Sequence, residues 1–427
     1  MGGGYNQSRW VEDWRRYRDP KKRDDILDRL KFIPLDGKGD IYLTLSGELR
    51  FRVNETTNPN LRAGEAQRQD ITRIVGGADL HLGSHVRLFG ELAHGGLAGQ
   101  NLGTITPQMR NDLVVQQSFV DLTGTIAQAD VGIRYGRQTF ADGPNLMVVP
   151  RDNNTIFTVY NGTRAWARAK QVRVDLFDFH TTQLGVGGTG DDISDRGRRF
   201  SGISGGIVLP KTLFGGSKLY LDPFFWRLRN SAATWGRTTT REERFFYGLH
   251  TLGDIGPVNL DWTVNHQGGN FDGRPISAWL LLFAQNYRLG KDRGAPRVGF
   301  HADYASGGGA YTGGTLRNAL APFGNNIYYS YQLYATPTNL IALDRGVKDL
   351  YAPVADNQPD HRAMAEHERS RLGLDHAEIG AWVSQARTPE GILAMPEALW
   401  RTLELASVLM DVDADLRREP VGLGELD

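Results

Sequence analysis

The stretch IYLTLSGELRFRVN, residues 41–54, alternates apolar and polar side chains along its whole length. Successive side chains of a β-strand point to opposite faces, so a period of two predicts a strand with one apolar and one charged face. In a soluble sandwich the apolar face covers a core, whereas in a membrane barrel it faces lipid and the charged face lines a wet lumen. The apolar parity carries Ile41, Leu43, Leu45, Leu49, Phe51 and Val53, and the polar parity carries Tyr42, Thr44, Ser46, Glu48, Arg50 and Arg52.

The number and spacing of further strands favour the barrel over a soluble all-β protein. Up to residue 343 the alternation recurs in about fourteen segments of ~9–11 residues, a length that crosses a bilayer when the strand is tilted. Tight turns such as LGSH (82–85) lie between some segments, and long polar stretches (95–112 and 229–244) lie between others. This arrangement predicts an antiparallel up-and-down transmembrane β-barrel in which the polar stretches are loops.

Composition excludes several other classes of protein. The chain has no Cys and therefore no disulfide framework and no thiol nucleophile. No apolar run approaches the ~18 residues of a membrane-spanning helix. The sequence contains no G-x-S-x-G motif, its ten His residues show no metal spacing, and the Gly-rich segment at 306–314 lacks the Lys-Ser/Thr of a phosphate loop. Basic residues form no unbroken patch for nucleic acid, and no cofactor or metal is indicated.

The formal charge divides the chain into two parts, although it is zero overall. Residues 344–427 contain 9 Lys and Arg against 17 Asp and Glu, a net charge of −8, which leaves +8 for residues 1–343. We interpret residues 1–39 as a polar leader with short helices, 40–343 as the outer-membrane barrel, and 344–427 as an acidic helical tail, with helices expected at 363–372 and 396–410. The alternation of the barrel stops before this tail.

Several segments, in collinear order between residues 20 and 343, resemble the alginate export porin family. They include DDILDRLKFIPLDGKGDIYLTLSGELRFRVNETTNPN (24–60), QQSFVDLTG with VGIRYGRQTF (116–140), and PRVGFHADYASGGG (296–309). The resemblance implies a monomeric barrel of about eighteen strands with an Arg-rich lumen. It also implies passive passage of a polyuronate from the periplasm to the outside. Beyond residue 343 the resemblance ends, where the family would continue with further strands. We therefore expect the tail to come from a frameshift, an assembly error or a gene fusion; a genuine periplasmic or regulatory tail is the alternative.

The resemblance also bears on the start of the chain. An outer-membrane protein needs a secretory signal, and none is visible in MGGGYNQSRWVEDW (1–14). The expectation is that the sequence begins at the mature protein or at a truncated gene start.

Transport of a polyuronate needs cationic side chains in the lumen, because the polymer carries one carboxylate per sugar. Arg suits this role since its planar guanidinium binds carboxylates bidentately. Strand parity points most of the candidates inward, whereas Arg137 falls on the outward parity and Arg151 in a loop. The candidate substrate contacts are Arg50, Arg52, Arg73, Arg87, Arg134, Arg137, Arg151, Arg164, Arg168, Arg173 and Arg297. The expected counter-charges are Glu48, Asp79, Glu91, Asp121, Asp175, Asp261 and Asp303.

The alternation predicts a channel and not an enzyme, and the resemblance implies that its cargo is an anionic polysaccharide such as alginate, exported passively. Its expected surroundings are bacterial outer-membrane lipid and, in the periplasm, further export components. A porin for small anions is one alternative. A β-rich polysaccharide lyase or hydrolase is another, because paired carboxylates are abundant. A second interpretation of the Arg–carboxylate pairs also stays open, in which they only stabilise the wall.

Overall fold

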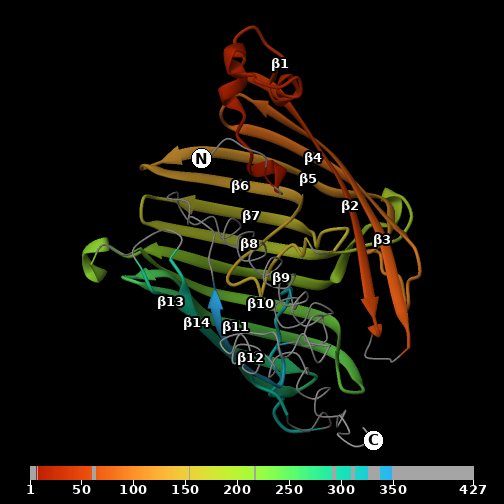
Figure 1. Ribbon diagram of the computed structural model, residues 1–427, viewed down its shortest axis with the longest axis vertical. Coiled ribbons are helices and arrows are strands. Elements are labelled where there is room, and N and C mark those ends of the chain that lie inside the picture. The colour runs from red at the N-terminus through yellow and green to blue at the C-terminus, as the bar shows by residue number, and fades with distance from the viewer. Residues whose placement is uncertain are drawn as a thin grey trace, which may run out of the picture.

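The fold is one antiparallel sheet in which every strand pairs with its neighbours in the sequence (Figure 1). The computed structural model describes residue 6 and residues 8–59, 64–152, 154–215, 218–290, 295–308, 313–325 and 337–348. The strands are β1 (Ile33–Pro34), β2 (Ile41–Thr57), β3 (Ala66–Leu82), β4 (Val86–Ala98), β5 (Asn111–Ile126), β6 (Ala129–Gln138), β7 (Tyr160–Arg168), β8 (Val172–Gln183), β9 (Ile193–Val208), β10 (Leu219–Trp235), β11 (Thr238–Ile255), β12 (Val258–Phe271), β13 (Arg274–Arg288), β14 (Arg297–Ala305) and β15 (Leu340–Lys348).

The helices are short and lie mostly before the sheet. Within the described residues they are η1 (Arg9–Val11), η2 (Arg15–Arg18), η3 (Pro20–Lys22), α1 (Asp28–Lys31), η5 (Thr189–Asp191) and η6 (Lys211–Phe214). The N-terminal ones, red in Figure 1, lie against the first strands of the sheet. In the described part of the chain, no helix is long and apolar enough to span a membrane.

Exposure on the two faces of the sheet is the reverse of that in a soluble protein. On one parity, Leu49 is 77% exposed and Phe51 66%. On the opposite parity, Arg73 and Asp175 are each 1% exposed. Exposing apolar side chains to water costs free energy, unless that face meets lipid. Burying charged side chains also costs free energy, unless the charges pair with one another. The sheet is therefore the wall of a membrane barrel, and the predicted parity of residues 41–54 is confirmed.

The connections differ at the two ends of the sheet. One end has the short turns 83–85, 127–128, 169–171 and 256–257, with longer connections at 209–218 and 289–296. The other end has the longest connections, 99–110, 139–159 and 306–339, together with the two-residue turns 236–237 and 272–273. In the turn between β5 and β6, Ala127 and Gln128 both have positive φ (48° and 67°), the geometry of a two-residue type I′ hairpin. Short turns at one end and long loops at the other are typical of bacterial outer-membrane barrels.

One predicted loop is wrong. Residues 229–244 belong to a β-hairpin in which β10 and β11 are joined at Trp235 and Thr238. Here both faces of the strands carry polar side chains, so the apolar alternation that marks a bilayer-crossing segment is missing. These strands, of 17 and 18 residues, are also longer than the predicted ~9–11 residues, because they extend beyond the apolar band.

The concave side of the sheet encloses an apolar cluster over β8–β13. Its members on the strands include Phe177, Phe200 and Trp226, and the loop at 139–159 adds Phe140 and Met147. A second loop, at 313–325, packs on the same cluster, since the amide of Phe323 donates to Met147 O at 2.9 Å. The two loops therefore fill the space in front of this part of the wall.

The described sheet is open, with β1 at one edge and β15 at the other. Apart from the two-residue β1, it has the predicted fourteen strands. The last strand continues to Lys348, past the boundary placed at residue 343. The helices expected at 363–372 and 396–410 lie outside the described residues, so the division of the chain into leader, barrel and tail stays a prediction.

Candidate transport lumen

A row of charged side chains runs across four consecutive strands on the inner face. Strand register places Arg87 of β4 opposite Asp121 of β5, Asp121 opposite Arg134 of β6, and Arg134 opposite Arg164 of β7. Directly opposite residues on one face have Cβ atoms ~4.5–5.5 Å apart, so these four side chains form a continuous band. The register of the hairpins therefore brings together residues that are up to 77 positions apart, a separation given by Arg87 and Arg164.

Each guanidinium in this row binds a carboxylate. Arg134 donates from Nε and Nη2 to the two oxygens of Asp121, at 2.7 and 2.8 Å. Arg87 donates from Nε to Asp79 Oδ1 at 2.7 Å. Arg164 donates from Nε to Asp175 Oδ1 at 2.9 Å. The pairing matches the predicted counter-charges, and it satisfies charges that burial would otherwise make very costly.

The row continues beyond β7 through Asp175. Arg173 donates to Asp175 Oδ2 and to Asp222 Oδ2, both at 3.0 Å, and its Nη2 lies 3.9 Å from Asp142 Oδ1. One carboxylate thus connects the guanidiniums of Arg164 and Arg173. From β10 onward the apolar cluster around Trp226 shares the inner face with polar side chains: Asp222 lies opposite His250 of β11, whose Nε2 is 2.7 Å from Asp261 of β12.

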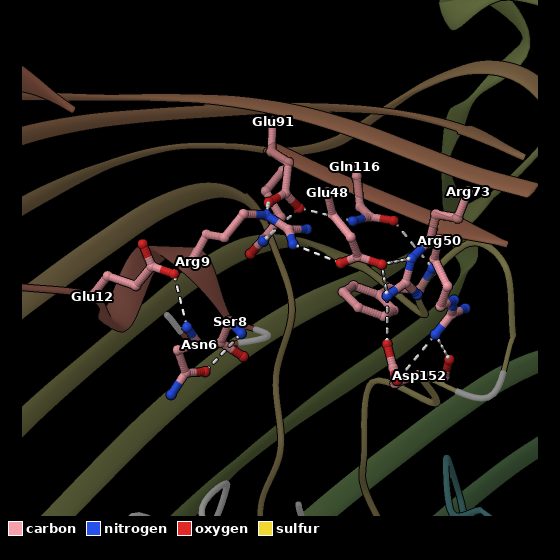
Figure 2. A network of polar contacts seen from close by, with 12 residues as sticks. Asn6, Ser8, Arg9, Glu12, Glu48, Arg50, Arg73, Glu91, Gln116 and Asp152 are labelled. Atoms are coloured by element: carbon pink, nitrogen blue, oxygen red, sulfur yellow. Dashed lines mark hydrogen bonds and ion pairs between the residues drawn. The ribbon is translucent and has the colours of Figure 1, made fainter. Parts of the chain in front are cut away.

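A second network lies on the inner face of β2–β4 and joins three separate parts of the chain (Figure 2). Arg73 donates from Nε to Glu48 Oε1 at 2.7 Å and from Nη2 to Asp152 Oδ1 at 2.8 Å. Arg50 donates to the carbonyl of Asp152 at 3.2 Å and to that of Asn154 at 3.1 Å. Asp152 belongs to the loop 139–159, so these bonds tie that loop to the inner face of β2 and β3.

The N-terminal segment enters the same network through Arg9. Its Nε donates to Glu91 Oε2 at 2.7 Å and its Nη1 to Glu48 Oε2 at 2.8 Å (Figure 2). Glu91 also accepts from the side-chain amide of Gln116 at 2.8 Å. Burial of the Arg9 guanidinium lowers its pKa, but the carboxylates of Glu91 and Glu48 outweigh this, and the net pKa is raised. Arg9 is therefore a permanent cation in the lumen.

Trp10, the next residue, covers the charged row itself. The guanidinium of Arg134 lies between two rings, 4.0 Å from the centroid of Trp10 and 3.6 Å from that of Phe119. The carbonyl of Trp10 accepts a hydrogen bond from Arg87 Nη2 at 2.6 Å. Cation–π stacking is strongest where the cation is desolvated. The leader segment is thus docked on the inner wall at two of its central arginines.

The other predicted site residues lie apart from the contacts described for these two networks. Arg137 keeps its outward parity and donates to Asn161 Oδ1 and to the carbonyls of Val115 and Asp192, each at 3.0 Å. Arg151 has a φ of 61°, and burial lowers the pKa of its guanidinium. The two remaining acids contact His residues: Asp261 lies 2.7 Å from His250 and Asp303 lies 2.9 Å from His301. Arg52 and Arg297 are half-buried, whereas Arg168 is exposed.

Sequence reasoning missed residues that come from outside the alternating segments. Arg9 and Trp10 lie in the leader, and Asp142 and Asp152 lie in the loop 139–159, where no periodicity indicates a direction. It also missed Arg244, which donates to Glu242 Oε1 and Gln267 Oε1 at 2.5 and 2.7 Å and is fully buried. The parity of β11 would have identified Arg244, had residues 229–244 been assigned to strands.

The described residues contain no cluster of His, Asp or Glu suited to holding a metal ion. Their chemistry is instead that of a channel: a membrane-facing apolar surface encloses a wall of fixed cations and anions. The fold and this inner wall define an outer-membrane β-barrel transport protein.

The sequence model of one family, described as alginate export, matches residues 41–348. The chain belongs to the alginate export family. It is therefore a transport channel of the bacterial outer membrane and not an enzyme, as predicted from the sequence. A search of curated proteins found no match.

Solved structures similar to this chain are porins with low sequence identity. OccAB1 of Acinetobacter baumannii is 11% identical, with 62% of this chain and 79% of that chain covered and a TM-score of 0.34. OprB of Pseudomonas putida, in a high-pH structure, is 10% identical, with 62% and 74% covered and a TM-score of 0.36. A BenF-like porin from Pseudomonas fluorescens Pf-5 is 9% identical, with 64% and 84% covered and a TM-score of 0.35.

Proposed function

We propose that this channel exports an anionic polysaccharide such as alginate, by diffusion along an electropositive, Arg-lined inner wall. The observation that carries the proposal is the row Arg87, Asp121, Arg134 and Arg164, which places three guanidiniums side by side on the inner wall, each with a carboxylate partner. A guanidinium fork binds a uronate carboxylate bidentately, so successive sugars can exchange along such a row.

The paired acids have a role in this mechanism. A channel must bind its cargo strongly enough for entry and weakly enough for exit. Asp79, Asp121 and Asp175 hold the guanidiniums in place and compete with the cargo for them. The acids therefore keep each contact weak, and a uronate carboxylate binds by taking the place of one of them at its guanidinium.

Passage also requires the leader segment to move. Trp10 lies on Arg134 and accepts from Arg87, so cargo reaches these two arginines only when residues 9–14 leave the wall. Arg9 offers Glu48 and Glu91 a cation that a polyuronate cannot replace. Undocking consequently leaves Glu91 without a cation, whereas Glu48 keeps Arg73, and the loss at Glu91 biases the resting channel toward its occupied form. We further propose that the protein acts as a monomer and receives its cargo from periplasmic export components.

A small-anion porin is the second candidate, and one observation favours it. The loops 139–159 and 313–325 pack on the inner face of β8–β13, and so they take up interior space that a polymer would need. A small anion would need only the charged part of the wall.

The test is the reversal potential of the refolded full-length chain in a planar lipid bilayer under a salt gradient. The export proposal expects an anion-selective current that added polyuronate reduces and neutral dextran of similar length does not. Selectivity should weaken at ~1 M salt, where screening shortens to about 3 Å. A current indifferent to polyuronate would support the small-anion porin instead, and cation selectivity would contradict both candidates.

A further inference from the structure

The outer face of the sheet carries a basic cluster just beyond the apolar, lipid-facing part of β8–β11, on the side that leads to the long loops. It consists of Arg199 of β9 and Arg227 and Arg229 of β10, flanked by Asp178 of β8 on one side and Glu243 of β11 on the other. The parity of these residues is that of the lipid-facing side chains Ile203, Phe225 and Tyr247 on the same strands, which are 39–49% exposed. We call these five charged residues the rim cluster.

The charges of the rim cluster do not balance. Arg227 and Arg229 both donate through Nε to a single oxygen, Oε1 of Glu243, at 2.6 and 2.9 Å. Arg199 pairs with Asp178. Three cations therefore share two anions. Register also places Arg229 directly opposite Arg199, and like charges in that position repel. An additional anion between these two guanidiniums would relieve the repulsion.

The position of the rim cluster corresponds to the headgroup zone of the membrane. Phe225 stacks with Phe245 and tilts against Tyr247, at centroid distances of 6.0 and 5.1 Å, as residues of an aromatic girdle do. The guanidinium of Arg227 lies 5.4 Å from the centroid of Phe245. Arg227 and Arg229 follow Phe225 by two and four positions, roughly 7 and 13 Å along the strand. Phosphates of an outer-leaflet lipid lie at this depth.

A second charged cluster at the same end of the sheet has the opposite balance. On the outer face of β2 and β3, Arg68 contacts Asp70 at 3.0 Å and Glu55 at 3.4 Å. One cation there faces two anions, and the side chain of Arg68 is 56% exposed, compared with 44% for Arg199 and 48% for Arg229. The surplus of positive charge is thus local to β8–β11 and is not a general property of the rim.

We propose that the rim cluster binds the phosphate groups of an anionic glycolipid in the outer leaflet, with a phosphate bridging Arg199 and Arg229. Arg binds phosphate bidentately through charge-assisted hydrogen bonds, and the apolar surface below the cluster receives the acyl chains. The site depends on the outer-membrane barrel but not on the identity of the exported cargo.

The experiment compares lipid retention by the refolded full-length chain in detergent, using native mass spectrometry with bisphosphorylated and dephosphorylated lipid A. The variants are R199Q/R229Q and, as the matched control, R68Q. We expect wild type and R68Q to bind the bisphosphorylated lipid alike, and R199Q/R229Q to bind it about tenfold more weakly. The dephosphorylated lipid should be bound weakly by all three proteins.

Several outcomes would overturn the proposal. These are equal retention of the two lipids by wild type, an equal loss in R68Q, or wild-type affinity in the double variant. Stronger binding of polyuronate than of lipid at the cluster would assign it to the cargo. If the double variant lacks the heat-modifiable gel band of a folded barrel, the salt dependence of wild-type retention decides: a phosphate contact weakens as salt rises, whereas purely apolar binding does not.

Discussion

The inner wall has two regions, which differ in the side chains that they bury. Over β2–β8, charged side chains face inward and neutralise one another, as in the pairs Arg134–Asp121 and Arg164–Asp175. Over β8–β13, aromatic side chains face inward and are covered by the loops 139–159 and 313–325. The apolar outer face does not change between the two regions. The membrane requires apolar side chains on the outer face of every strand. The inner face, by contrast, can carry either paired charges or packed aromatic side chains.

The largest expected effect lies in the aromatic region. Trp226 is fully buried, and its Nε1 donates to Ser204 Oγ at 3.0 Å. Replacing Trp226 by Ala leaves a large cavity and should lower the free energy of unfolding by about 4 kcal/mol. Urea unfolding in detergent, followed by the heat-modifiable gel band, measures this loss.

The neighbouring residue provides the control for that variant. Phe225 lies on the outer parity and is 39% exposed. Phe225→Ala removes a similar volume from the lipid face without creating an enclosed cavity, so its loss should be clearly smaller. Equal losses for the two variants would mean that the region over β8–β13 is not a packed core, and the contrast between the regions would fail.

A smaller but still large effect is expected in the charged region. Asp121→Asn removes the bidentate partner of Arg134, which is 2% exposed, and leaves a buried cation uncompensated. Breaking one side of a buried ion pair costs about 3 kcal/mol. Unfolding of D121N, of R134Q and of D121N/R134Q, each compared with wild type, completes a double-mutant cycle. Recovery of part of the loss in the double variant is the expected result, and strict additivity would show that the pair does not interact.

The smallest effect on stability is expected at the leader segment, where the effect on transport should be the greatest. Arg9→Gln removes one cation, but Glu91 retains the amide of Gln116, so unfolding should change by about 1 kcal/mol. The bilayer current should rise, because Trp10 loses the anchor that holds it on Arg134.

Arg15→Gln serves as the matched control for this variant. Arg15 lies in the same segment and pairs with Asp13, but its side chain is 71% exposed. Its replacement should leave the current unchanged. An unchanged current in Arg9→Gln, together with proteolytic release of the leader, would show that the segment does not block the charged wall.

How much of this could be predicted from the sequence differs between the two regions. In the charged region, parity alone oriented Arg73, Arg87 and Arg134 correctly, since lipid forces strict alternation on the outer face. The same rule predicts that Phe177 and Trp226 point inward, but a wet lumen gave no reason to expect aromatic residues there. Their cover comes from loops, and a loop without periodicity carries no signal of where it folds. The charged row also depends on the register between strands, which turns such as Ala127–Gln128 set. This turn lacks the Asn-Gly sequence that usually marks such a hairpin, so the sequence did not predict it.

The order of the strands, identical to their order in the chain, has a consequence for how the molecule assembles in time. Every strand pairs with its neighbours in the sequence, so the wall can grow one strand after another at low entropic cost. The contact between Phe323 and Met147 is different, because it joins the connection after β14 to the connection after β6, which is distant in the sequence. Pairings of such high sequence separation form late. The interior of this barrel is therefore filled after its wall is built, and a trapped loop, not a mispaired strand, is the slow step to look for in refolding kinetics.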